Sequence, residues 1–366
     1  MILVLTAGFG DGHNSAAAAT AEAFRHLCPG EEVRVCDLIS EVLPRLSGVL
    51  KALYQQVITH APTAWRLVYR LLEHSELDPD RSPWLVPLVH GLQDRLAAGR
   101  PRLIVSTYPL HADLLEVLRR QGLALPPLVT VITDSISVHR VWTRKPSDLF
   151  CVADEETRAV VARHGVPEAK IRVTGFPVSL RFAEPPPPAA DDRPDRILYL
   201  PSTPARHVAA TLRALTPLLR GGVRLTLPVG KHRARLYHVL RAFTDAWPEA
   251  PLEVLGWTDR MPELLRSHDV VICKAGGAIL HEVLAARIPA VIDYVVPGQE
   301  EGNAEMLLSR DGALRSHSPA ETAAAVRQIL ADGGRLGTAM RERLQPISVP
   351  DAALRTARAA LEAVGD

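Results

Sequence analysis

The stretch Asp269-Val-Val-Ile-Cys-Lys-Ala-Gly-Gly-Ala-Ile-Leu-His-Glu282 decides the fold class. Residues 269–274 are typical of a buried strand, residues 275–277 of a tight turn, and residues 278–286 of an Ala/Leu-rich helix. A strand that passes through such a turn into a helix indicates a parallel sheet covered by helices. The N–H groups at the helix start can face a diphosphate. Glu282 can offer two acceptor oxygens to the vicinal hydroxyls of a ribose.

Short apolar runs alternate with longer helical patterns throughout the 366 residues. This length suits two domains with a ligand between them. We therefore expect an α/β protein made of two doubly wound domains. The strand candidates are residues 2–6, 32–37, 102–106, 128–133 and 149–152 in the first half, and residues 196–200, 223–228, 252–255, 269–273 and 289–293 in the second.

A proline-rich segment separates the two halves. The run from Phe176 to Pro194 contains four successive prolines and several charges, so it cannot continue a helix or a central strand. A semi-rigid spacer is favoured over a ligand for a proline-recognising module. We expect an N-terminal domain at 1–178, a linker at 179–195 and a C-terminal domain at 196–366, with the last helix packing back on the first domain.

Residues 41–98 lack a convincing strand and predict a helical insertion. Aromatic and aliphatic side chains there are interleaved with Arg45, Lys51, Arg66 and Arg70. This pattern is compatible with a surface that touches lipid headgroups. A helical layer packed on the sheet is the alternative, and the sequence alone favours it.

The composition argues against several classes of protein. With 42 Lys+Arg, 41 Asp+Glu and a net charge of +1, the chain shows no sign of nucleic-acid binding. Cys28, Cys36, Cys151 and Cys273 form no Cys-x-x-Cys pair and are expected to be free thiols. The first strand begins at once without a leader, and no apolar run approaches about 18 residues. We therefore expect a soluble cytoplasmic protein, with the inner face of the cell membrane as a possible site.

The first strand runs into Gly8-Phe-Gly-Asp-Gly-His13 and then a helix. Glycines at 10 and 12 allow close approach of a ligand, and the helix start favours an oxyanion. Asp37, at the end of the second strand, is an ambiguous match to the dinucleotide-binding pattern. His13 lies on the turn itself, where an imidazole can serve as a general base. A solvated polar residue is the alternative.

Residues 129–137 form a buried strand that delivers Thr133, Asp134 and Ser135 to its carboxyl end, where ligands of open α/β sheets bind. Asp134 could orient a base or bind a hydroxyl. Capping of the following loop is an equal alternative.

A polar loop follows the strand at 289–293. It reads Tyr294-Val-Val-Pro-Gly-Gln-Glu-Glu-Gly-Asn303, and Gln299 and Glu300 are adjacent acceptors suited to sugar hydroxyls. Because unpaired buried polar groups are costly, this run favours a binding loop over a structural one.

These motifs together resemble one glycosyltransferase family. It contains the monogalactosyldiacylglycerol synthases, the processive diacylglycerol glucosyltransferases and, more distantly, the N-acetylglucosaminyltransferase that makes lipid II. The similarity covers nearly the whole chain. It rests on Gly-x-Gly-His at 10–13, Thr-Asp at 133–134, the run at 165–178, Lys-Ala-Gly-Gly-x-x-x-x-Glu at 274–282 and Pro-Gly-Gln-Glu-x-x-Asn at 297–303.

The resemblance implies a GT-B fold, in which two Rossmann-like domains face a cleft. It implies an acceptor in the N-terminal domain, a UDP-sugar in the C-terminal domain, and inversion at the anomeric carbon without a metal or other cofactor. Asp78-Pro-Asp80 resembles the metal-binding motif of another glycosyltransferase fold, but it lies in a loop without a preceding strand.

The resemblance also assigns roles. His13 would deprotonate the acceptor hydroxyl, with Asp134 as the second catalytic residue. Glu282 would bind the ribose, Gly276 and Gly277 the phosphates, and Gln299 and Glu300 the transferred sugar. Residues 255–261 occupy the place where the family's backbone reads uracil. The expected donor-binding residues are Gly10, Gly12, Ser202, Thr203, Trp257, Met261, Lys274, Gly276, Gly277, Glu282, Pro297, Gly298, Gln299, Glu300 and Asn303.

Three positions depart from the family pattern. Ser179 stands where an arginine commonly neutralises the diphosphate, and Arg181 or Arg206 would have to replace it. The first C-terminal strand runs into Pro201-Ser-Thr-Pro204 instead of a glycine-rich turn, although Ser202 and Thr203 can still donate to phosphate. His281 stands where a small hydroxyl residue is common.

We therefore expect transfer of a hexose from a UDP-sugar to a lipid hydroxyl, with diacylglycerol as the leading acceptor and helices in 41–98 as the membrane contact. The alternatives are a soluble small-molecule acceptor, an epimerase, and a sugar-nucleotide binder without turnover. The sequence does not name the sugar or the oligomeric state.

Overall fold

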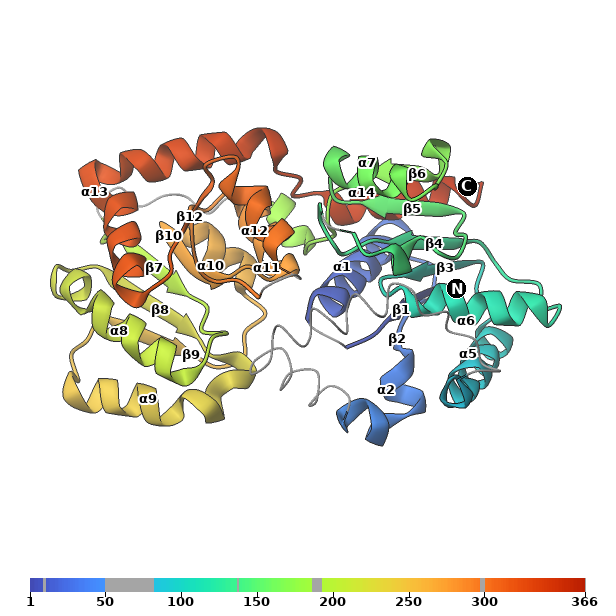
Figure 1. Cartoon of the computed structure of the whole chain (residues 1–366), viewed down its shortest axis with the longest axis horizontal. Coiled ribbons are helices and arrows are strands. Elements are labelled where there is room, and N and C mark those ends of the chain that lie inside the picture. Colours follow the sequence, from blue (N-terminus) through green and yellow to red (C-terminus); the bar gives the residue numbers. More distant parts are fainter. Residues whose placement is uncertain (9–10, 50–81, 137, 186–192, 297–299, 366) are drawn as a thin grey trace. The chain divides into compact units, whose positions relative to one another are not determined.

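The computed structural model describes residues 1–8, 11–49, 82–136, 138–185, 193–296 and 300–365. These residues form two compact units, each around its own parallel sheet (Figure 1). The first unit contains residues 1–180, 296–302 and 349–366, and the second contains residues 181–295 and 303–348.

The described strands of the first unit form one sheet in the order β2-β1-β3-β4-β5-β6, and all neighbouring pairs are parallel. The chain crosses from β2 past β1 to reach β3. The point where the strand order reverses is therefore between β1 and β3. The bounds are β1 Ile2–Thr6, β2 Val33–Asp37, β3 Leu103–Ser106, β4 Leu128–Val131, β5 Leu149–Val152 and β6 Ile171–Val173.

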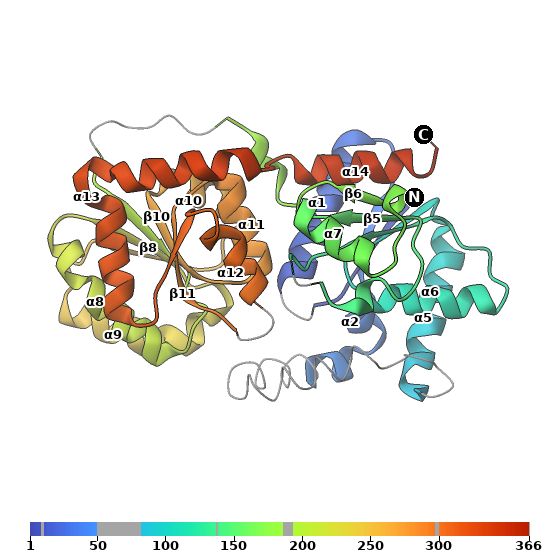
Figure 2. The same ribbon diagram turned by 45° about the horizontal axis from the view of Figure 1, so that its top comes forward.

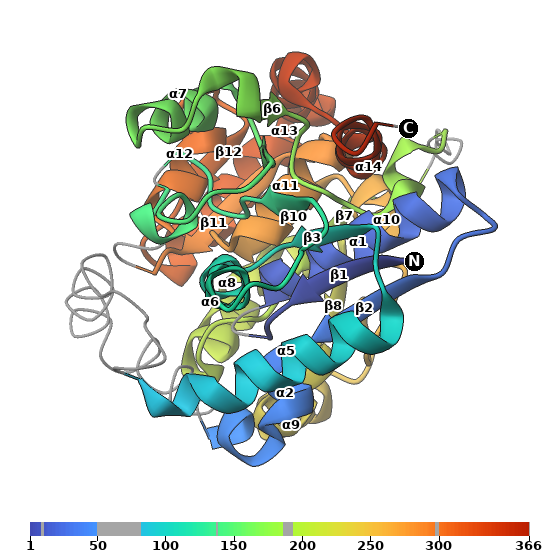
Figure 3. The same cartoon turned by 90° about the vertical axis from the view of Figure 1, so that its right-hand side faces the viewer.

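Alternate side chains of β1 point to opposite faces of this sheet, and each face is covered by different helices. Leu3 and Leu5 pack with α2, α5 and α6, whereas Ile2 and Val4 pack with α1 and α14 (Figure 3). The helix bounds are α1 Asp11–Leu27, α2 Leu38–Val42, α5 Val86–Gly99, α6 Leu110–Arg120, α7 Glu155–Arg163 and α14 Ala352–Glu362, with short 3-10 turns at Pro83–Leu85, Arg140–Trp142 and Glu168–Lys170.

The second unit has the strand order β12-β11-β10-β7-β8-β9, again with parallel pairs. Counted from β7, this is the 3-2-1-4-5-6 order of dinucleotide-binding folds. Its order reverses between β7 and β10. The bounds are β7 Arg196–Tyr199, β8 Arg224–Pro228, β9 Leu252–Leu255, β10 Val270–Lys274, β11 Ala290–Tyr294 and β12 Ala313–Arg315.

One face of the second sheet packs against α8, α9 and α13 through Ile197, Tyr199, Ile272 and Val291. Residues 331–334 leave helical geometry inside α13, and Figure 2 shows the resulting bend. The helix bounds are α8 Ala205–Arg220, α9 Arg233–Ala246, α10 Met261–Ser267, α11 Gly277–Ala286, α12 Glu301–Leu308 and α13 Pro319–Leu344, with 3-10 turns at Leu180–Ala183, Gly230–His232 and Gln345–Ile347.

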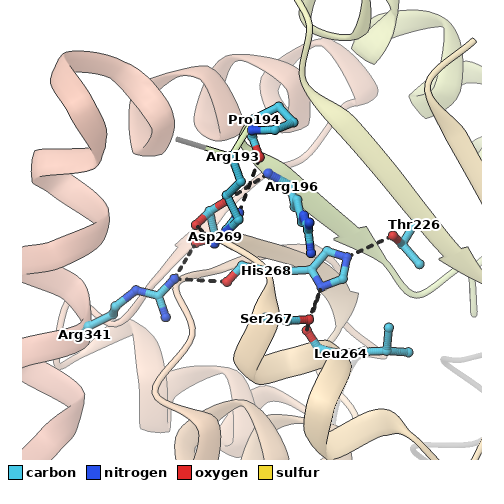
Figure 4. A network of polar contacts seen from close by, with 9 residues as sticks. All are labelled: Arg193, Pro194, Arg196, Thr226, Leu264, Ser267, His268, Asp269 and Arg341. Carbon is cyan, nitrogen blue, oxygen red and sulfur yellow. Dashed lines mark hydrogen bonds and ion pairs between the residues drawn. The ribbon is translucent and has the colours of Figure 1, made fainter. Parts of the chain in front are cut away.

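A polar clamp fixes the amino ends of β7 and β10 (Figure 4). The Asp269 carboxylate accepts both terminal nitrogens of Arg193 at 2.8 Å and also the backbone N–H of Arg196 at 2.8 Å. Arg341 of α13 donates to the carbonyls of His268 and Asp269. The clamp thus joins the end of the proline-rich segment to both strands, at the opposite end of the sheet from the candidate site.

The predicted α/β class with two doubly wound sheets is confirmed, and most predicted strands agree within two residues. β6 and β12 were not predicted, because each has only three residues and too short a run to show a period. Of the predicted helical insertion, the structure describes α2, a helical stretch at 44–49 and α5. Residues 50–81, which include Lys51, Arg66 and Arg70, lie outside the described residues.

The C-terminal helix α14 belongs to the first unit, where Ala353, Ala357 and Ala360 pack with Ala17 and Phe24 of α1. The small side chains let the two helices approach closely. Within the described residues, no helix is long and apolar enough to cross a membrane.

A substitution at Gly175 tests how closely the start of α14 packs against the chain after β6. Its φ is +85°, and a Cβ there would lie 2.7 Å from Ala352 Cβ and 2.9 Å from Val349 Cγ1. We expect Gly175→Ala to destabilise the chain by about 1–3 kcal/mol from overpacking, in addition to about 1–2 kcal/mol from the left-handed backbone. Gly122→Ala is the matched control, because its φ is +86° and nothing lies within 4 Å. Urea unfolding should show a clearly larger loss for Gly175→Ala, and equal losses would contradict this packing.

Candidate functional site

Both sheets bring their candidate residues to the carboxyl ends of the strands. In open α/β sheets, ligands bind at this edge where the strand order reverses. In the first unit that point lies between β1 and β3, and in the second between β7 and β10. His13 follows β1, and Gly276 follows β10. Each unit therefore has one half-site, which is the set of candidate residues at its own switch point.

His13 lies in the first turn of α1, and its ring is hydrogen-bonded to residues that follow the neighbouring strands β3 and β4. Nδ1 is 2.8 Å from the carbonyl oxygen of Thr107, which follows β3, and 2.8 Å from Thr133 Oγ1. Because a carbonyl only accepts, Nδ1 carries the proton in this arrangement. Nε2 then carries the lone pair, as a general base requires.

Aromatic rings and a carboxylate surround His13. The Tyr108 ring meets it edge-on at 5.0 Å between centroids, and Trp142 lies at 6.0 Å. Burial lowers the pKa of His13 below its ordinary 6.5, while the negative charge of Asp134 and the bond to Thr107 raise it in part. The imidazole is thus kept neutral, and a carboxylate is ready to stabilise the imidazolium that forms after proton uptake.

Asp134 is fixed by Trp142, whose Nε1 donates to Asp134 Oδ2 at 2.7 Å. Burial raises the pKa of Asp134, whereas the bond from Trp142 and the charges of His13 and His139 lower it. Two residues further on, Ile136 has a φ of +61°. A β-branched residue with positive φ is strained, and such strain often occurs where a loop presents functional groups. The sequence left three roles open for Asp134, which were to orient a base, to bind a hydroxyl or to cap a loop. In the structure its carboxylate accepts from Trp142, and its charge raises the pKa of His13.

The Asp37 carboxylate, an ambiguous match to the dinucleotide-binding pattern, accepts hydrogen bonds from the backbone of this chain. Its Oδ1 accepts the N–H of Ser40 at 3.1 Å, which caps α2. Its Oδ2 accepts the N–H of Gly8 at 3.2 Å and so fixes the end of the β1 loop. Gly12 is half-buried in α1, whereas Gly10 lies outside the described residues.

The second half-site begins where β10 ends at Lys274. Gly276 is the N-cap of α11 and provides no side-chain cap to the helix N–H groups. Its φ is −68°, and a Cβ would meet only ordinary contacts at 3.5 Å or more. Neither the backbone nor the packing therefore demands glycine here. A bare helix start does favour a phosphate that approaches the backbone closely.

Glu282 lies in the second turn of α11 and is half-buried. Burial raises its pKa to about 7. His281 is buried beside it. Asn303, also predicted as a donor contact, donates from Nδ2 to the carbonyl of Ala275 at 3.4 Å and so supports the turn before α11.

The turn between β7 and α8 is held by Arg235 of α9, which donates to the carbonyls of Thr203 and Pro201. Ser202 is exposed, whereas the Thr203 hydroxyl is buried. Pro204, the N-cap of α8, offers no side-chain cap. Of the two proposed replacement arginines, Arg206 is exposed in the first turn of α8, and Arg181 pairs with Glu263 and the carbonyl of Asp259.

Trp257 is 82% exposed in the loop after β9, and Met261 is the first residue of α10. Glu300 is buried, with Oε2 accepting the N–H of Val296 at 3.0 Å. Pro297, Gly298 and Gln299 lie outside the described residues. Among the described residues, no group of three or more His, Cys, Asp or Glu side chains is arranged to hold a metal ion.

The sequence did not identify Thr107, Tyr108 or Trp142 as parts of the site. Thr107 acts through its backbone carbonyl, which every residue type possesses. Trp142 lies in a 3-10 turn without a periodic pattern, and only its indole N–H connects it to Asp134. The structural role of Arg235 was also missed, since its partners are carbonyls.

Known proteins resemble this chain in sequence and in fold. The profile of the monogalactosyldiacylglycerol (MGDG) synthase family matches residues 13–178. A processive diacylglycerol beta-glucosyltransferase of Bacillus cereus is 28% identical, with 96% of this chain and 91% of the relative aligned.

Solved structures share the fold over nearly the whole chain. MurG of Acinetobacter baumannii superposes with a TM-score of 0.61 at 15% identity, with 99% of both chains covered. HepE of Anabaena, solved in complex with UDP-glucose, superposes with a TM-score of 0.58 at 12% identity, with 99% of this chain and 98% of that chain covered. The chain therefore has the GT-B fold. The predicted resemblance is confirmed, because the chain is similar to the monogalactosyldiacylglycerol synthases and the processive diacylglycerol glucosyltransferases.

Proposed function

We propose that this chain is an inverting glycosyltransferase that moves a hexose from a UDP-sugar to a hydroxyl of a lipid acceptor, with diacylglycerol as the leading acceptor. The observation that carries the proposal is the half-buried His13, whose Nδ1 is fixed on the Thr107 carbonyl and whose Nε2 is left as the base. A nucleotide-binding protein without turnover would have no use for a base prepared in this way.

The reaction needs one proton transfer and one displacement. Nε2 of His13 takes the proton of the acceptor hydroxyl as the oxygen attacks C1 of the sugar, and the bond from C1 to the diphosphate breaks. A single displacement inverts the configuration at C1. Asp134 stabilises the imidazolium through its charge. General-base catalysis of this kind contributes about 10²–10⁴-fold.

The leaving diphosphate gains negative charge, and the second unit offers backbone donors for it. The uncapped starts of α11 and α8 follow neighbouring strands, so their N–H groups meet at one edge of the sheet. Glu282 binds the ribose and the loop at 297–300 the hexose. We propose that this arrangement needs no metal or other cofactor. A donor of the UDP class is supported by the fold similarity to HepE, whose structure contains UDP-glucose.

A lipid acceptor is supported by the names of the relatives and by one surface of the first unit. In the helical stretch at 44–49, Leu46 is 39% exposed and Val49 is 65% exposed, next to the exposed Arg45. Aliphatic side chains beside a cation suit the interface of an anionic membrane. We propose that this stretch, together with the rest of 41–98, contacts the membrane at its inner face.

Product formation tests the proposed reaction directly. The chain is incubated with each of a panel of UDP-sugars and with diacylglycerol in anionic vesicles, and products are identified by mass spectrometry with and without EDTA. We expect a β-linked glycolipid from an α-linked donor, no loss with EDTA, and a kcat for His13→Ala lower by about 10²–10⁴-fold with unchanged UDP affinity.

Other outcomes of this assay identify the alternatives. Transfer to a soluble alcohol without vesicles would indicate a small-molecule acceptor, and sugar interconversion without any acceptor would indicate an epimerase. Full turnover by His13→Ala would remove His13 as the base. Binding of UDP without any product would indicate a nucleotide sensor.

The pH profile tests the pairing of His13 with Asp134. A base must be neutral, and burial lowers the pKa of His13, so kcat/KM should rise with pH and level off below the ordinary value of 6.5. Asp134→Asn removes a charge that raises this pKa. We expect its acid limb to move to lower pH and its plateau to fall. Glu116→Gln, which removes a carboxylate of α6 that pairs with Arg119, should keep the normal profile. An unmoved limb in Asp134→Asn would contradict the pairing.

Glu282 predicts a second pH dependence, in donor binding. Its pKa is raised to about 7, and protonation removes an acceptor for the ribose hydroxyls. UDP affinity measured by calorimetry should therefore weaken as the pH falls through about 7. Glu282→Gln should bind UDP weakly and lose this part of the dependence, while the ionisation of UDP itself affects both proteins alike. The exposed Glu305→Gln is the control. Identical pH slopes for Glu282→Gln and the unsubstituted chain would remove Glu282 from the site.

A further inference from the structure

We propose that His207 of α8, held by Asp293 of β11, donates a hydrogen bond to the terminal phosphate of a nucleoside diphosphate, and that Asp293 is its positioning residue. This inference rests on the proposed function, because it concerns the donor that the second unit would bind.

The contact spans the centre of the second half-site. His207 Nε2 lies 3.1 Å from Asp293 Oδ2. α8 follows β7, whereas Asp293 belongs to β11, and β10 lies between these two strands. The pair therefore crosses the carboxyl end of β10, where the chain continues into Gly276 and α11. A ligand at the start of α11 would have this pair beside it.

Asp293 is an unusual residue for its place. Val291, two residues earlier on the same strand, faces the core under α8 and α13. The contact with His207 of α8 puts the Asp293 side chain on that face as well. Its side chain is fully buried. A buried carboxylate is costly unless it is paired. Within the described residues, His207 is the ion-pair partner found for it.

Three neutral hydroxyl groups are also buried around Asp293. The hydroxyls of Tyr199, Thr203 and Thr211 are buried near it, and each lacks a hydrogen-bond partner among the described residues, as does Asp293 Oδ1. Burial, and then the charge of Asp293, raises the pKa of Tyr199, so this hydroxyl keeps its proton. These groups can share an internal water with the carboxylate, but they supply no positive charge to it.

His207 reaches from this buried carboxylate to the surface, because its side chain is 20% exposed while that of Asp293 is not exposed. It lies in the first turn of α8, where Pro204 leaves the helix N–H groups without a side-chain cap. With Nε2 donating to Asp293, Nδ1 can donate to a phosphate when the ring carries both protons. The ring would then donate to one anion on each side, and hydrogen bonds to ionised acceptors are the strong ones.

A ligand series separates a phosphate contact from a structural role. Calorimetry measures the binding of UDP, UMP and uridine to the full chain and its variants, with thermal unfolding as a check on folding. We expect His207→Gln, which keeps a donor for Asp293 but cannot be charged, to weaken UDP binding by about tenfold or more. UMP should weaken less, and uridine should bind unchanged.

Asp293→Asn should weaken UDP in the same order of ligands, and the double variant should lose no more than His207→Gln alone, because both act through one contact. His238→Gln is the matched control, since His238 is an exposed histidine on α9 of the same unit. It should bind all three ligands normally.

Three results would overturn the inference while leaving the proposed function in place. These are unchanged UDP binding in His207→Gln, an equal loss for UDP, UMP and uridine, and a UDP loss found in Arg206→Gln but not in His207→Gln. If the unsubstituted chain bound no UDP while binding another sugar nucleotide or none, the proposed donor would fail first, and this inference with it.

Discussion

Parallel pairing of the strands is the constraint on which both half-sites depend. In a parallel sheet every strand ends at the same edge, so loops that are distant in sequence meet there. His13 and Thr107 are 94 residues apart, yet they are hydrogen-bonded because β1 and β3 are neighbours. Likewise β7, β10 and β11 bring the starts of α8 and α11 to one edge with Asp293. The chemistry of the chain follows from this shared edge more than from any single loop.

The sequence predicted the sheets and the main polar groups because these depend on local patterns. Apolar runs identified most strands, and His13, Asp134, Gly276 and Glu282 stand at strand or helix ends where chemistry is expected. What could not be predicted depends on partners without a side-chain signal. The proton position on His13 is set by a backbone carbonyl, and the β7–α8 turn is held by Arg235 through two other carbonyls. Neither contact requires a particular residue type at the acceptor.

The turn Pro201-Ser-Thr-Pro204 stands where the family has a glycine-rich turn, and Arg235 stabilises it through two carbonyls. A glycine-rich turn would leave backbone donors free, whereas two prolines remove N–H groups and restrict the backbone. Here Arg235 stabilises the turn from outside, and the uncapped start of α8 follows directly. Arg181 forms an ion pair with Glu263 of α10 and donates to the carbonyl of Asp259. Its guanidinium therefore stabilises the start of α10. Arg206 and His207, which are adjacent in the first turn of α8, then remain as the candidates for a phosphate contact on this side.

Burial shifts the pKa values of the two half-sites in opposite directions, and both shifts favour the neutral form. It lowers the pKa of His13 and raises that of Glu282, because in each case it disfavours the charged form. A base must be neutral before it accepts a proton, so the lowered pKa of His13 suits the role proposed for it. A ribose contact needs its acceptor oxygens, so the shift of Glu282 works against binding unless the ligand supplies donors that favour the carboxylate. With the roles proposed for these two residues, nucleotide binding would be coupled to proton release at Glu282, and acceptor activation to proton uptake at His13.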